Sequence, residues 1–328
     1  MRIEASLNKL RKSRFSVTPI NFLPDEILAR IFQWVTHAQS LGFEKLIDET
    51  PFPENTLAIA QVCARWRRVA FGSRSIGSHI DLSIDDRVVS LAKSFAYHSR
   101  DQPLSIRVIE PLERWKANDS PTKLNDFISV VGPSTGSLEF TWDLPIPCLV
   151  PSSQWPQILE HSISCAAKGL TRLTLSVRDV HHTHYETGYA HWYLVTTHST
   201  MHSRDGASRT VILSGIREEL YENILLSIKS LSLDRIYPLW TSKAYHGLLD
   251  LRLNGPRETT FTITIQQFAN SLAASPGLRV LHFGLEVGFS GGMPQPIHLE
   301  ILKCFCFNPP SLRRNTVFCD SFYLVRSH

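Results

Sequence analysis

The sequence predicts an α/β protein, in which a small helical module at the N-terminus is followed by a solenoid of parallel strands and helices. Two observations predict this class. Near the N-terminus, apolar residues recur in two short segments at the three- and four-residue spacing of an amphipathic helix. Further along the chain, an alternating leucine pattern that is typical of strands recurs several times at related intervals.

The composition fits a folded chain that has no membrane-spanning segment. Of the 328 residues, 43% are hydrophobic and 20% are charged, so the chain can form packed cores in about two domains. Apolar runs such as residues 57–63 are far shorter than the roughly 20 residues that cross a bilayer. No secretory leader pattern is recognisable. We therefore expect no membrane partner and a cytoplasmic and/or nuclear location.

The net charge and the cysteine spacing indicate which kinds of partner and ligand can be expected. The net charge of +4 is too small to indicate a nucleic-acid-binding protein. The clearest local excess of basic residues is near the start, where residues 1–18 are predicted to form a solvated basic leader. The six cysteines are scattered and form no C-x-x-C pair, as is typical of reduced thiols. We therefore expect no nucleic-acid partner, no metal site and no cofactor.

The first helix is predicted to begin near Asn21 or Pro24. Proline is tolerated in the first turn of a helix, and Asp25 and Glu26 suit the positive end of the helix dipole. The apolar residues that follow at helical spacing are Ile27, Leu28, Ile31, Phe32 and Val35. They predict one broad apolar face.

A second helix is predicted over residues 57–69, after a break at Pro51 and Pro53. Its charged residues, Arg65, Arg67 and Arg68, are expected near its C-terminal end, where cations suit the dipole. Residues 80–84 then alternate as a strand. Two helices this short leave apolar surface uncovered, which either packs on the rest of the chain or docks on a partner.

Residues 23–28, 31–32 and 60–70 resemble an F-box. The family pattern has an L-P-x-E-I-L start, an I-F a few residues later and a V-C-x-x-W-R-x-V-A helix, and both halves occur here in order. The resemblance implies a three-helix module over residues 19–82 that binds a Skp-type adaptor and, through it, a cullin–RING ubiquitin ligase. Carried over by position, it implies adaptor binding by Leu23, Pro24, Ile27, Leu28, Ile31, Val62, Cys63, Trp66 and Val69.

The sequence departs from the family pattern in two places. The linker over residues 36–56 is longer than the usual short connection. Near the end of the module, Gly77 stands where the family often has a tryptophan, although the preceding apolar position is kept by Ile76. The second departure concerns the third helix of the module and leaves the first two helices unaffected.

A repeated pattern covers much of residues 83–307. A helix capped by Asp85 and Asp86 and a strand over residues 104–108 are predicted to begin this part. The pattern L-x-x-L-x-L and its close variants then start at Leu170, Ile228, Leu248, Leu278 and Leu299. The last four starts are 20, 30 and 21 residues apart, near the length of leucine-rich repeats. We interpret this part as an irregular leucine-rich-repeat domain; the alternative is an ordinary α/β domain with leucine-rich strands.

The clearest repeat covers residues 265–283. Phe268, Leu272 and Ala273 are predicted to share one helix face, and the following strand alternates apolar and polar residues. In stacked units of this kind, the polar strand positions face away from the helices. They are candidates for contacting a target protein, and the set is Arg172, Lys229, Ser232, Arg252, Arg279 and His282.

Two segments lack the leucine pattern. The histidine-rich stretch near residues 179–209 holds His181, His182, His184, His191, His198 and His202. A long polar loop is predicted there rather than a zinc site, because no recognisable ligand set is completed nearby. Residues 308–328 are predicted to form a tail, either as a cap or as a disordered segment.

A short motif raises the alternative of an enzyme. Residues 132–136 match the G-x-S-x-G motif of serine hydrolases, with Ser134 as the nucleophile. That motif needs a strand before the serine and a helix after it, whereas residues 138–142 predict a strand after it. A turn without a catalytic role is the preferred interpretation.

These predictions favour a non-enzymatic, substrate-recruiting subunit of an SCF-type cullin–RING ubiquitin ligase. Its N-terminal module would bind the Skp-type adaptor of the cullin complex, and its repeats would bind an unknown target protein. Two alternatives stay open: an interaction scaffold with no link to a ligase, and a serine hydrolase that uses Ser134.

Overall fold

The computed structural model describes residues 19–38, 59–83, 86–99, 102–110, 122–144, 155–179, 192–197, 209–255, 262–288, 299 and 301–307. The predicted leader, the tail and the six histidines of the histidine-rich stretch lie outside the described residues. The chain divides into two compact units, namely residues 1–81 with 91–102, and residues 82–90 with 103–328. Each unit is described by itself below.

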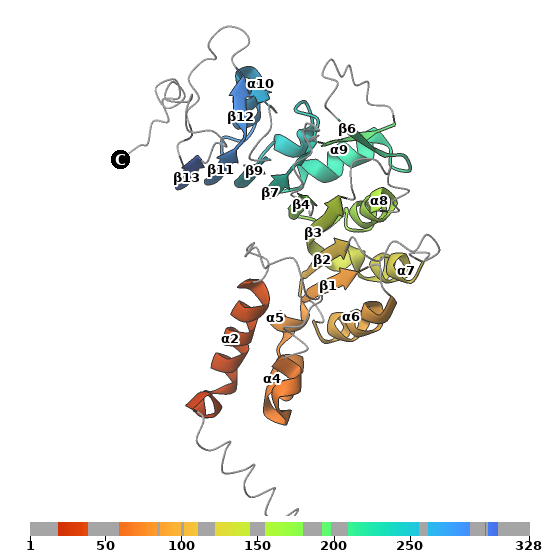
Figure 1. The fold of residues 1–328 in the computed structure, drawn as a ribbon, viewed down its shortest axis with the longest axis vertical. Helices are drawn as coiled ribbons and strands as arrows, with labels where there is room; N and C mark the ends of the chain where they lie inside the picture. Colours follow the sequence, from red (N-terminus) through yellow and green to blue (C-terminus); the bar gives the residue numbers. More distant parts are fainter. Residues whose placement is uncertain are drawn as a thin grey trace, which may run out of the picture. The chain divides into compact units, whose positions relative to one another are not determined.

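The first unit is built from short helices. A 3-10 turn, η1 (Pro19–Phe22), precedes helix α2 (Asp25–Ala38), which confirms the first predicted helix. The carbonyl of Pro24 accepts hydrogen bonds from the backbone N–H groups of Ile27 and Leu28, so the proline starts the helix without needing an N–H of its own. Helix α4 (Ala64–Gly72) and the single turn α5 (Arg74–Gly77) follow and pack beside α2 (Figure 1).

The prediction of one continuous second helix is wrong. Residues 59–62 are helical, but Cys63 adopts an extended backbone conformation and α4 begins after it. The thiol of Cys63 accepts a hydrogen bond from the backbone N–H of Trp66, as a cap residue does. A cysteine that reads as apolar in the sequence therefore acts as an N-cap, and it interrupts the helix at the point where the pattern is most regular.

The core of this unit lies between α2 and the segments that follow it. The buried side chains are Leu28, Phe32, Ile59, Ala60, Val69, Ala70 and Ile76, and Trp66 packs against them. The rings of Phe32 and Trp66 lie 4.8 Å apart between their centroids, so the two halves of the motif meet at this aromatic pair.

Gly77 is required by a close backbone approach. A Cβ atom at this position would lie 3.1 Å from the carbonyl oxygen of Phe95 and 3.5 Å from the backbone nitrogen of Ser99, both in helix α6 (Asp86–Ser99). The ring of Phe95 also stacks on that of Phe71, with centroids 5.6 Å apart. The backbone of α6 thus occupies the space that a larger side chain at residue 77 would need, which accounts for the departure from the family pattern.

The second unit contains a sheet whose strands follow one another in chain order. The sheet order is β1-β2-β3-β4-β7-β9-β11-β13, and the described pairs from β2 to β13 are all parallel. The strands are β1 (His79–Ser83), β2 (Leu104–Glu110), β3 (Thr135–Leu144), β4 (Arg172–Asp179), β7 (Ser230–Asp234), β9 (Asp250–Asn254), β11 (Val280–Gly284) and β13 (Cys304–Phe307). The mixed α/β class with a parallel sheet is therefore confirmed.

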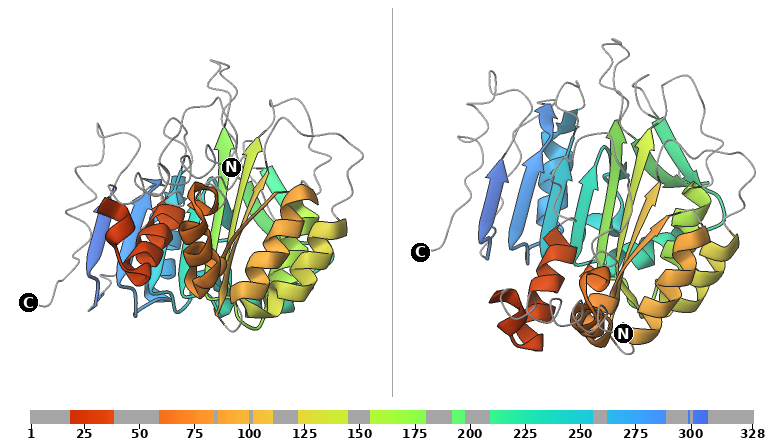
Figure 2. Two further views of the ribbon diagram at one scale, coloured as in Figure 1. Left: turned by 90° about the horizontal axis from the view of Figure 1, so that it is seen from below. Right: turned by 60° about the horizontal axis from the view of Figure 1, so that its bottom comes forward.

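Helices cover one face of this sheet (Figure 2). They are α7 (Thr122–Val131), α8 (Trp155–Cys165), α9 (Glu218–Leu226) and α10 (Ile265–Ala273). The inward strand residues meet them directly: Trp142 of β3 stacks on Trp155 at 4.3 Å, and Phe283 of β11 packs on Phe268 at 4.3 Å between ring centroids. Alternate residues of the strands from β2 to β11 are therefore buried, and the residues between them form the other face. Phe305 of β13, at the end of the sheet order, is 39% exposed.

The leucine pattern predicts the buried positions of three adjacent strands. Leu231, Leu251 and Leu281 lie opposite one another in the register and are at most 1% exposed. The fifth pattern, which starts at Leu299, is wrong in register because Phe305, and not Leu302, lies opposite Leu281. The prediction that Ala273 shares the buried face of its helix is also wrong, because this residue is exposed on α10.

A smaller sheet overlaps the segment that is predicted to be a long polar loop. Strand β5 (Trp192–Thr196) lies between β6 (Arg209–Leu213) and β8 (Ile236–Pro238) in a three-stranded parallel sheet. Trp192, Leu194 and Val195 are buried, so this part of residues 179–209 is an ordered strand. The histidines around it mask its apolar character in the sequence. A further parallel pair joins β10 (Thr262–Thr264) and β12 (Glu286–Gly288).

Candidate functional site

One side of helix α2 is apolar and open to solvent. At about 100° per residue, Ile27, Ile31 and Trp34 lie on one side of the helix, while Leu28 and Phe32 turn toward the core. Ile27 is 45% exposed, Trp34 is 64% exposed and Val35 is 41% exposed. We call Ile27, Ile31, Trp34 and Val35 the apolar face of α2. Such a row of exposed large side chains is unusual for a surface that contacts only water.

Further apolar side chains of the same unit are exposed, among them Phe22 and Val62. Phe22, in the turn before α2, is 73% exposed, and Val62, at the end of the helical residues before Cys63, is 57% exposed. The guanidinium carbon of Arg30 lies 5.7 Å from the ring centroid of Trp34, within reach of a cation–π contact. The exposed apolar surface therefore extends beyond the residues that the family pattern indicates.

The nine residues implied for adaptor binding do not share one environment. Pro24, Ile27 and Val62 are exposed, and Leu23, Ile31, Cys63 and Trp66 are partly buried. Leu28 and Val69 are 0% and 7% exposed and belong to the core of the unit, which corrects their implied place on a docking surface. Phe22, Trp34 and Val35 were not among the nine. The helical spacing of Ile27, Ile31 and Trp34 was the signal for Trp34, and Val35 was already part of the predicted apolar face.

Arg65 ties the start of α2 to α4. It donates hydrogen bonds from Nε and Nη2 to Oδ1 of Asp25 at 2.9 and 2.7 Å, and its Nη2 also donates to the carbonyl of Leu23. Nε of Arg67 donates to the carbonyl of Ala60 at 3.0 Å. These bonds hold the segment that carries Pro24 and Ile27 in a fixed position relative to α4.

The expected role of these arginines at a helix C-terminus is wrong. Because α4 begins only at Ala64, Arg65, Arg67 and Arg68 lie in its first half, where the helix dipole disfavours a positive charge. The carboxylate of Asp25 and the backbone carbonyls offset that cost for Arg65 and Arg67. Arg68 lies further from the same carboxylate, at 3.6 Å, and is 74% exposed.

The helix-free face of the large sheet carries a row of polar residues. Strand pairing places Arg107, Glu139, Thr174, Ser232, Arg252, His282 and Cys306 opposite one another from β2 to β13. We call this set the open-face row. Three of the six candidate target residues, Ser232, Arg252 and His282, belong to it. Arg172 is exposed in the neighbouring row, and Lys229 and Arg279 are exposed just before β7 and β11.

Charges on the open face are partly paired. Nε of Arg107 lies 3.1 Å from a carboxylate oxygen of Glu139. Arg252 donates two hydrogen bonds to Asp250, at 3.0 and 3.2 Å. Burial raises the pKa of Asp234 to about 6, against the opposing effects of the Arg235 charge and a hydrogen bond from Ser176. The face therefore offers both hydrogen-bonding groups and a carboxyl that titrates near pH 6.

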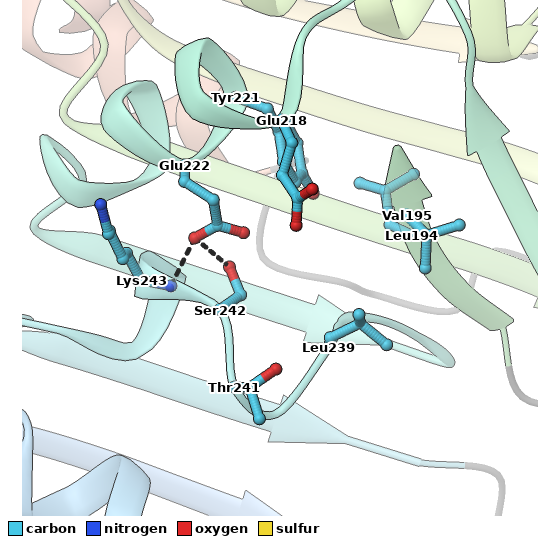
Figure 3. Close-up of a pocket in the computed structure, with 9 residues that line it drawn as sticks. All are labelled: Leu194, Val195, Glu218, Tyr221, Glu222, Leu239, Thr241, Ser242 and Lys243. Atoms are coloured by element: carbon cyan, nitrogen blue, oxygen red, sulfur yellow. Dashed lines mark hydrogen bonds between the residues drawn. The ribbon is translucent and has the colours of Figure 1, made fainter. Parts of the chain in front are cut away.

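A small cavity lies beside α9 (Figure 3). Its volume is about 170 Å³, below the size of sites that take drug-sized ligands. The carboxylate of Glu222 points into a turn, where it accepts hydrogen bonds from the Ser242 hydroxyl at 3.0 Å and the Lys243 backbone N–H at 2.6 Å. Burial raises the pKa of the Tyr221 hydroxyl above its ordinary value, with the charge of Glu222 acting in the same direction. Glu222 is thus engaged in holding the turn η5 (Lys243–Tyr245).

Ser134 does not lie on a nucleophile elbow. It ends the 3-10 turn η4 (Gly132–Ser134), which follows helix α7 and leads into strand β3. The order is helix, turn and strand, the reverse of the order that presents a nucleophile in α/β-hydrolases. The structure therefore agrees with the turn that the sequence indicates at this position.

Within the described residues, no helix combines the length and apolar character that crossing a bilayer requires. A comparison with protein-family models finds a match to the F-box-like family over residues 20–82. The search of curated proteins and the search of solved structures find no match. The matched range contains α2, α4, α5 and the apolar face of α2. Residues 20–82 of this chain are an F-box-like domain.

Proposed function

We propose that this chain is the substrate-recruiting F-box subunit of an SCF-type cullin–RING ubiquitin ligase. Its F-box-like domain binds a Skp-type adaptor, and the adaptor links it to the cullin. The chain itself makes and breaks no bond in this scheme. It raises the local concentration of a target protein beside the ligase, which is a proximity effect.

The exposed apolar face of α2 is the observation that carries the proposal. Fully burying one large aliphatic or aromatic side chain contributes about 1.5–3 kcal/mol. Ile27, Trp34 and Val62 are each close to half exposed or more, so a partner that covers them gains a useful part of this free energy. The bonds of Arg65 to Asp25 and Leu23 hold the start of α2 in place, so little ordering is needed when a partner binds.

The open-face row supports the second half of the proposal. Residues of seven neighbouring strands contribute one polar side chain each, and extended polar surfaces of this kind suit a protein target that is recognised through hydrogen bonds and charge. Arg252 and Arg279 are the cations that we propose for target contact. The unit that carries them would act as an irregular leucine-rich-repeat domain, which the sequential parallel strands and their buried leucines support.

The test is a pull-down of a purified Skp-type adaptor with the full chain. Ile27→Asp and Val62→Asp place a charge on the proposed contact without entering the core, and we expect each to weaken adaptor capture at least tenfold. The matched control is Val130→Asp on α7, which adds the same charge at a side chain that is 79% exposed in the other unit. Circular dichroism checks that each variant folds.

The same experiment separates the proposal from the scaffold alternative. If the wild-type chain captures no adaptor, the ligase role fails and a scaffold remains. Equal capture by Ile27→Asp, Val62→Asp and the control would contradict the assigned surface. For the target half, ubiquitylation of a bound protein should require both Ile27 and Arg252.

A further inference from the structure

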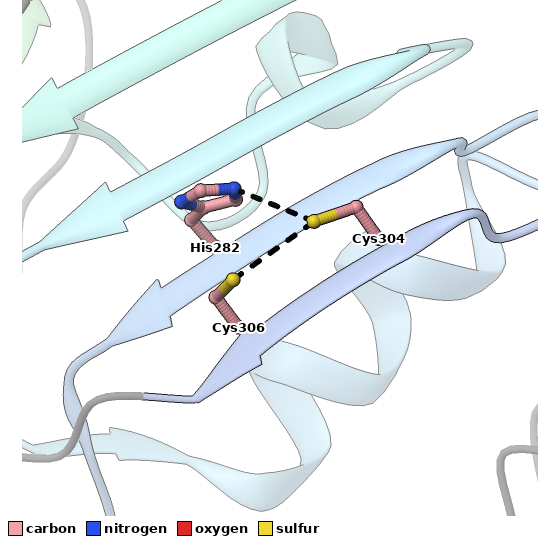
Figure 4. A group of neighbouring side chains, drawn as sticks. All are labelled: His282, Cys304 and Cys306. Carbon is pink, nitrogen blue, oxygen red and sulfur yellow. Dashed lines mark hydrogen bonds between the residues drawn. The ribbon is translucent and has the colours of Figure 1, made fainter.

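Three side chains of the kinds that bind metal ions lie together at the last strand of the large sheet (Figure 4). His282 lies on β11, and Cys304 and Cys306 lie on the adjacent strand β13. The register pairs His282 with Cys306 and Val280 with Cys304. Because alternate residues of a strand point to the same face, both cysteines lie on the helix-free face together with His282. Residues 22 and 24 positions apart in the sequence are thereby brought together.

The distances between the sulfur and nitrogen atoms of these three side chains resemble those in a metal site whose ligands are already in place. Sγ of Cys304 lies 3.8 Å from Nε2 of His282 and 3.9 Å from Sγ of Cys306. The three ligand atoms all lie within 4.8 Å of one another. Tetrahedral Zn²⁺ with Zn–S bonds of about 2.3 Å and Zn–N bonds of about 2.05 Å places two sulfurs about 3.8 Å apart, and a sulfur and a nitrogen about 3.6 Å apart. Only small side-chain shifts are needed to reach this arrangement.

We propose that His282, Cys304 and Cys306 form a zinc site of the Cys₂His type. Two thiolates and one imidazole are the soft and borderline ligands that Zn²⁺ prefers. They fill three of four tetrahedral positions, and solvent or a group from a bound partner takes the fourth, because Cys306 is exposed. The site contains no C-x-x-C pair, which is why the cysteine spacing did not indicate it. This proposal is independent of adaptor binding.

A disulfide between the two cysteines is the competing use of this pair. Residues two apart on one strand have Cα atoms about 6.6 Å apart, near the upper limit of about 6.8 Å for disulfides. The bond would therefore distort β13. A metal ion needs no such distortion, and it also joins β13, the last strand in the sheet order, to its neighbour β11.

The site can be tested by titrating the reduced, metal-free full chain with Co²⁺, whose thiolate complexes absorb in the near ultraviolet. We expect a thiolate-to-cobalt band that saturates at one equivalent and disappears when Zn²⁺ displaces Co²⁺. Cys304→Ser and Cys306→Ser should each weaken Co²⁺ binding at least tenfold. His282→Ala should keep a weaker thiolate band with an altered visible spectrum, because one ligand is lost.

The matched control is Cys165→Ser. Sγ of Cys165 lies 3.6 Å from Nε2 of His161, so this pair has the same chemistry without the second cysteine of the proposed site. Cys165→Ser should leave the cobalt band unchanged. The proposal is overturned if no thiolate band forms, or if the band survives in the Cys304→Ser/Cys306→Ser double variant. It is also overturned if a thiol count under denaturing conditions shows the two cysteines joined as a disulfide in protein purified without added reductant or chelator.

Discussion

The F-box-like domain and the large sheet expose opposite kinds of surface. On α2, the exposed side chains are large and apolar, with Ile27 and Trp34 as the clearest examples. On the helix-free face of the sheet, the partly exposed side chains are polar, as Ser232 and Arg252 show. Leu28 of the domain and Leu231 of the sheet are both 0% exposed. The difference indicates two kinds of recognition: burial of apolar area by the domain, and hydrogen bonds and charge by the sheet.

The contrast follows from the periods of the two elements. A strand alternates strictly, so the residues between the buried leucines of β7 and β9 are all free to be polar. Side chains of a helix point in all directions around its axis. The apolar residues of α2 occupy a wider arc of the helix than the small core of the domain can bury. The excess apolar side chains are therefore specific to the domain, which makes them its most informative feature.

The largest expected effect is a difference in stability between substitutions at two neighbouring residues of α2. Leu28→Ala removes a side chain that is 0% exposed and should lower the free energy of unfolding by about 2–5 kcal/mol, because it leaves a cavity beside Phe32. Ile27→Ala, at a position 45% exposed, should cost about 1 kcal/mol or less. Denaturant unfolding of the full chain, followed by tryptophan fluorescence, measures both. Equal losses would mean that Ile27 belongs to the core.

A second effect concerns the polar face of the sheet. The pKa of Asp234 is about 6 in the folded chain against 3.8 as the ordinary value. Between these values the folded state binds more protons than the unfolded state, so stability falls as the pH rises from about 4 to about 6. The contribution is fully present below pH 4 and amounts to at most about 3 kcal/mol.

Asp234→Asn tests this assignment because it removes the titrating group and keeps the shape of the side chain. Unfolding free energies of wild type and variant should diverge between pH 4 and pH 6, with the wild type losing stability relative to the variant. Parallel pH profiles would show that Asp234 is solvated as an ordinary carboxylate. No comparable titration is expected from the apolar face of α2.

The smallest effect concerns the arginines of α4. Arg65→Ala removes the hydrogen bonds to Asp25 and Leu23 and should lower stability by about 1 kcal/mol, since the pair is partly solvated. Arg68→Ala, at 3.6 Å from the same carboxylate and 74% exposed, should cost less than about 0.5 kcal/mol. Thermal unfolding of both variants checks the order. If Arg65→Ala is also silent, the bonds to Asp25 do not hold the start of α2.

The sequence predicts repeating local patterns better than it predicts exposure or register. The helical spacing in α2 and the alternation in β7, β9 and β11 indicate these elements correctly, because one face of each is buried. The break at Cys63 is not visible, since a thiol cap looks like one more apolar residue of the helix.

Long-range placement is the part that sequence spacing leaves open. The burial of Leu28 and the exposure of Ile27 depend on which side of α2 the residues after the linker cover. The meeting of His282 with Cys306 depends on the register of β11 and β13. The leucine pattern predicts Leu302 opposite Leu281, whereas Phe305, three residues later, occupies that position. Strand β5 is hidden for a similar reason, because its five residues are surrounded by polar histidine-rich sequence.

Calorimetry of the full chain against a purified Skp-type adaptor, at several temperatures and two salt concentrations, tests most directly whether the apolar face of α2 is a binding surface. We predict saturable binding with a negative change in heat capacity, because apolar area leaves water, and an affinity that changes little with salt. Ile27→Asp should remove the binding signal. No binding by the wild type, or binding with no heat-capacity change and a steep loss of affinity at high salt, would contradict the account.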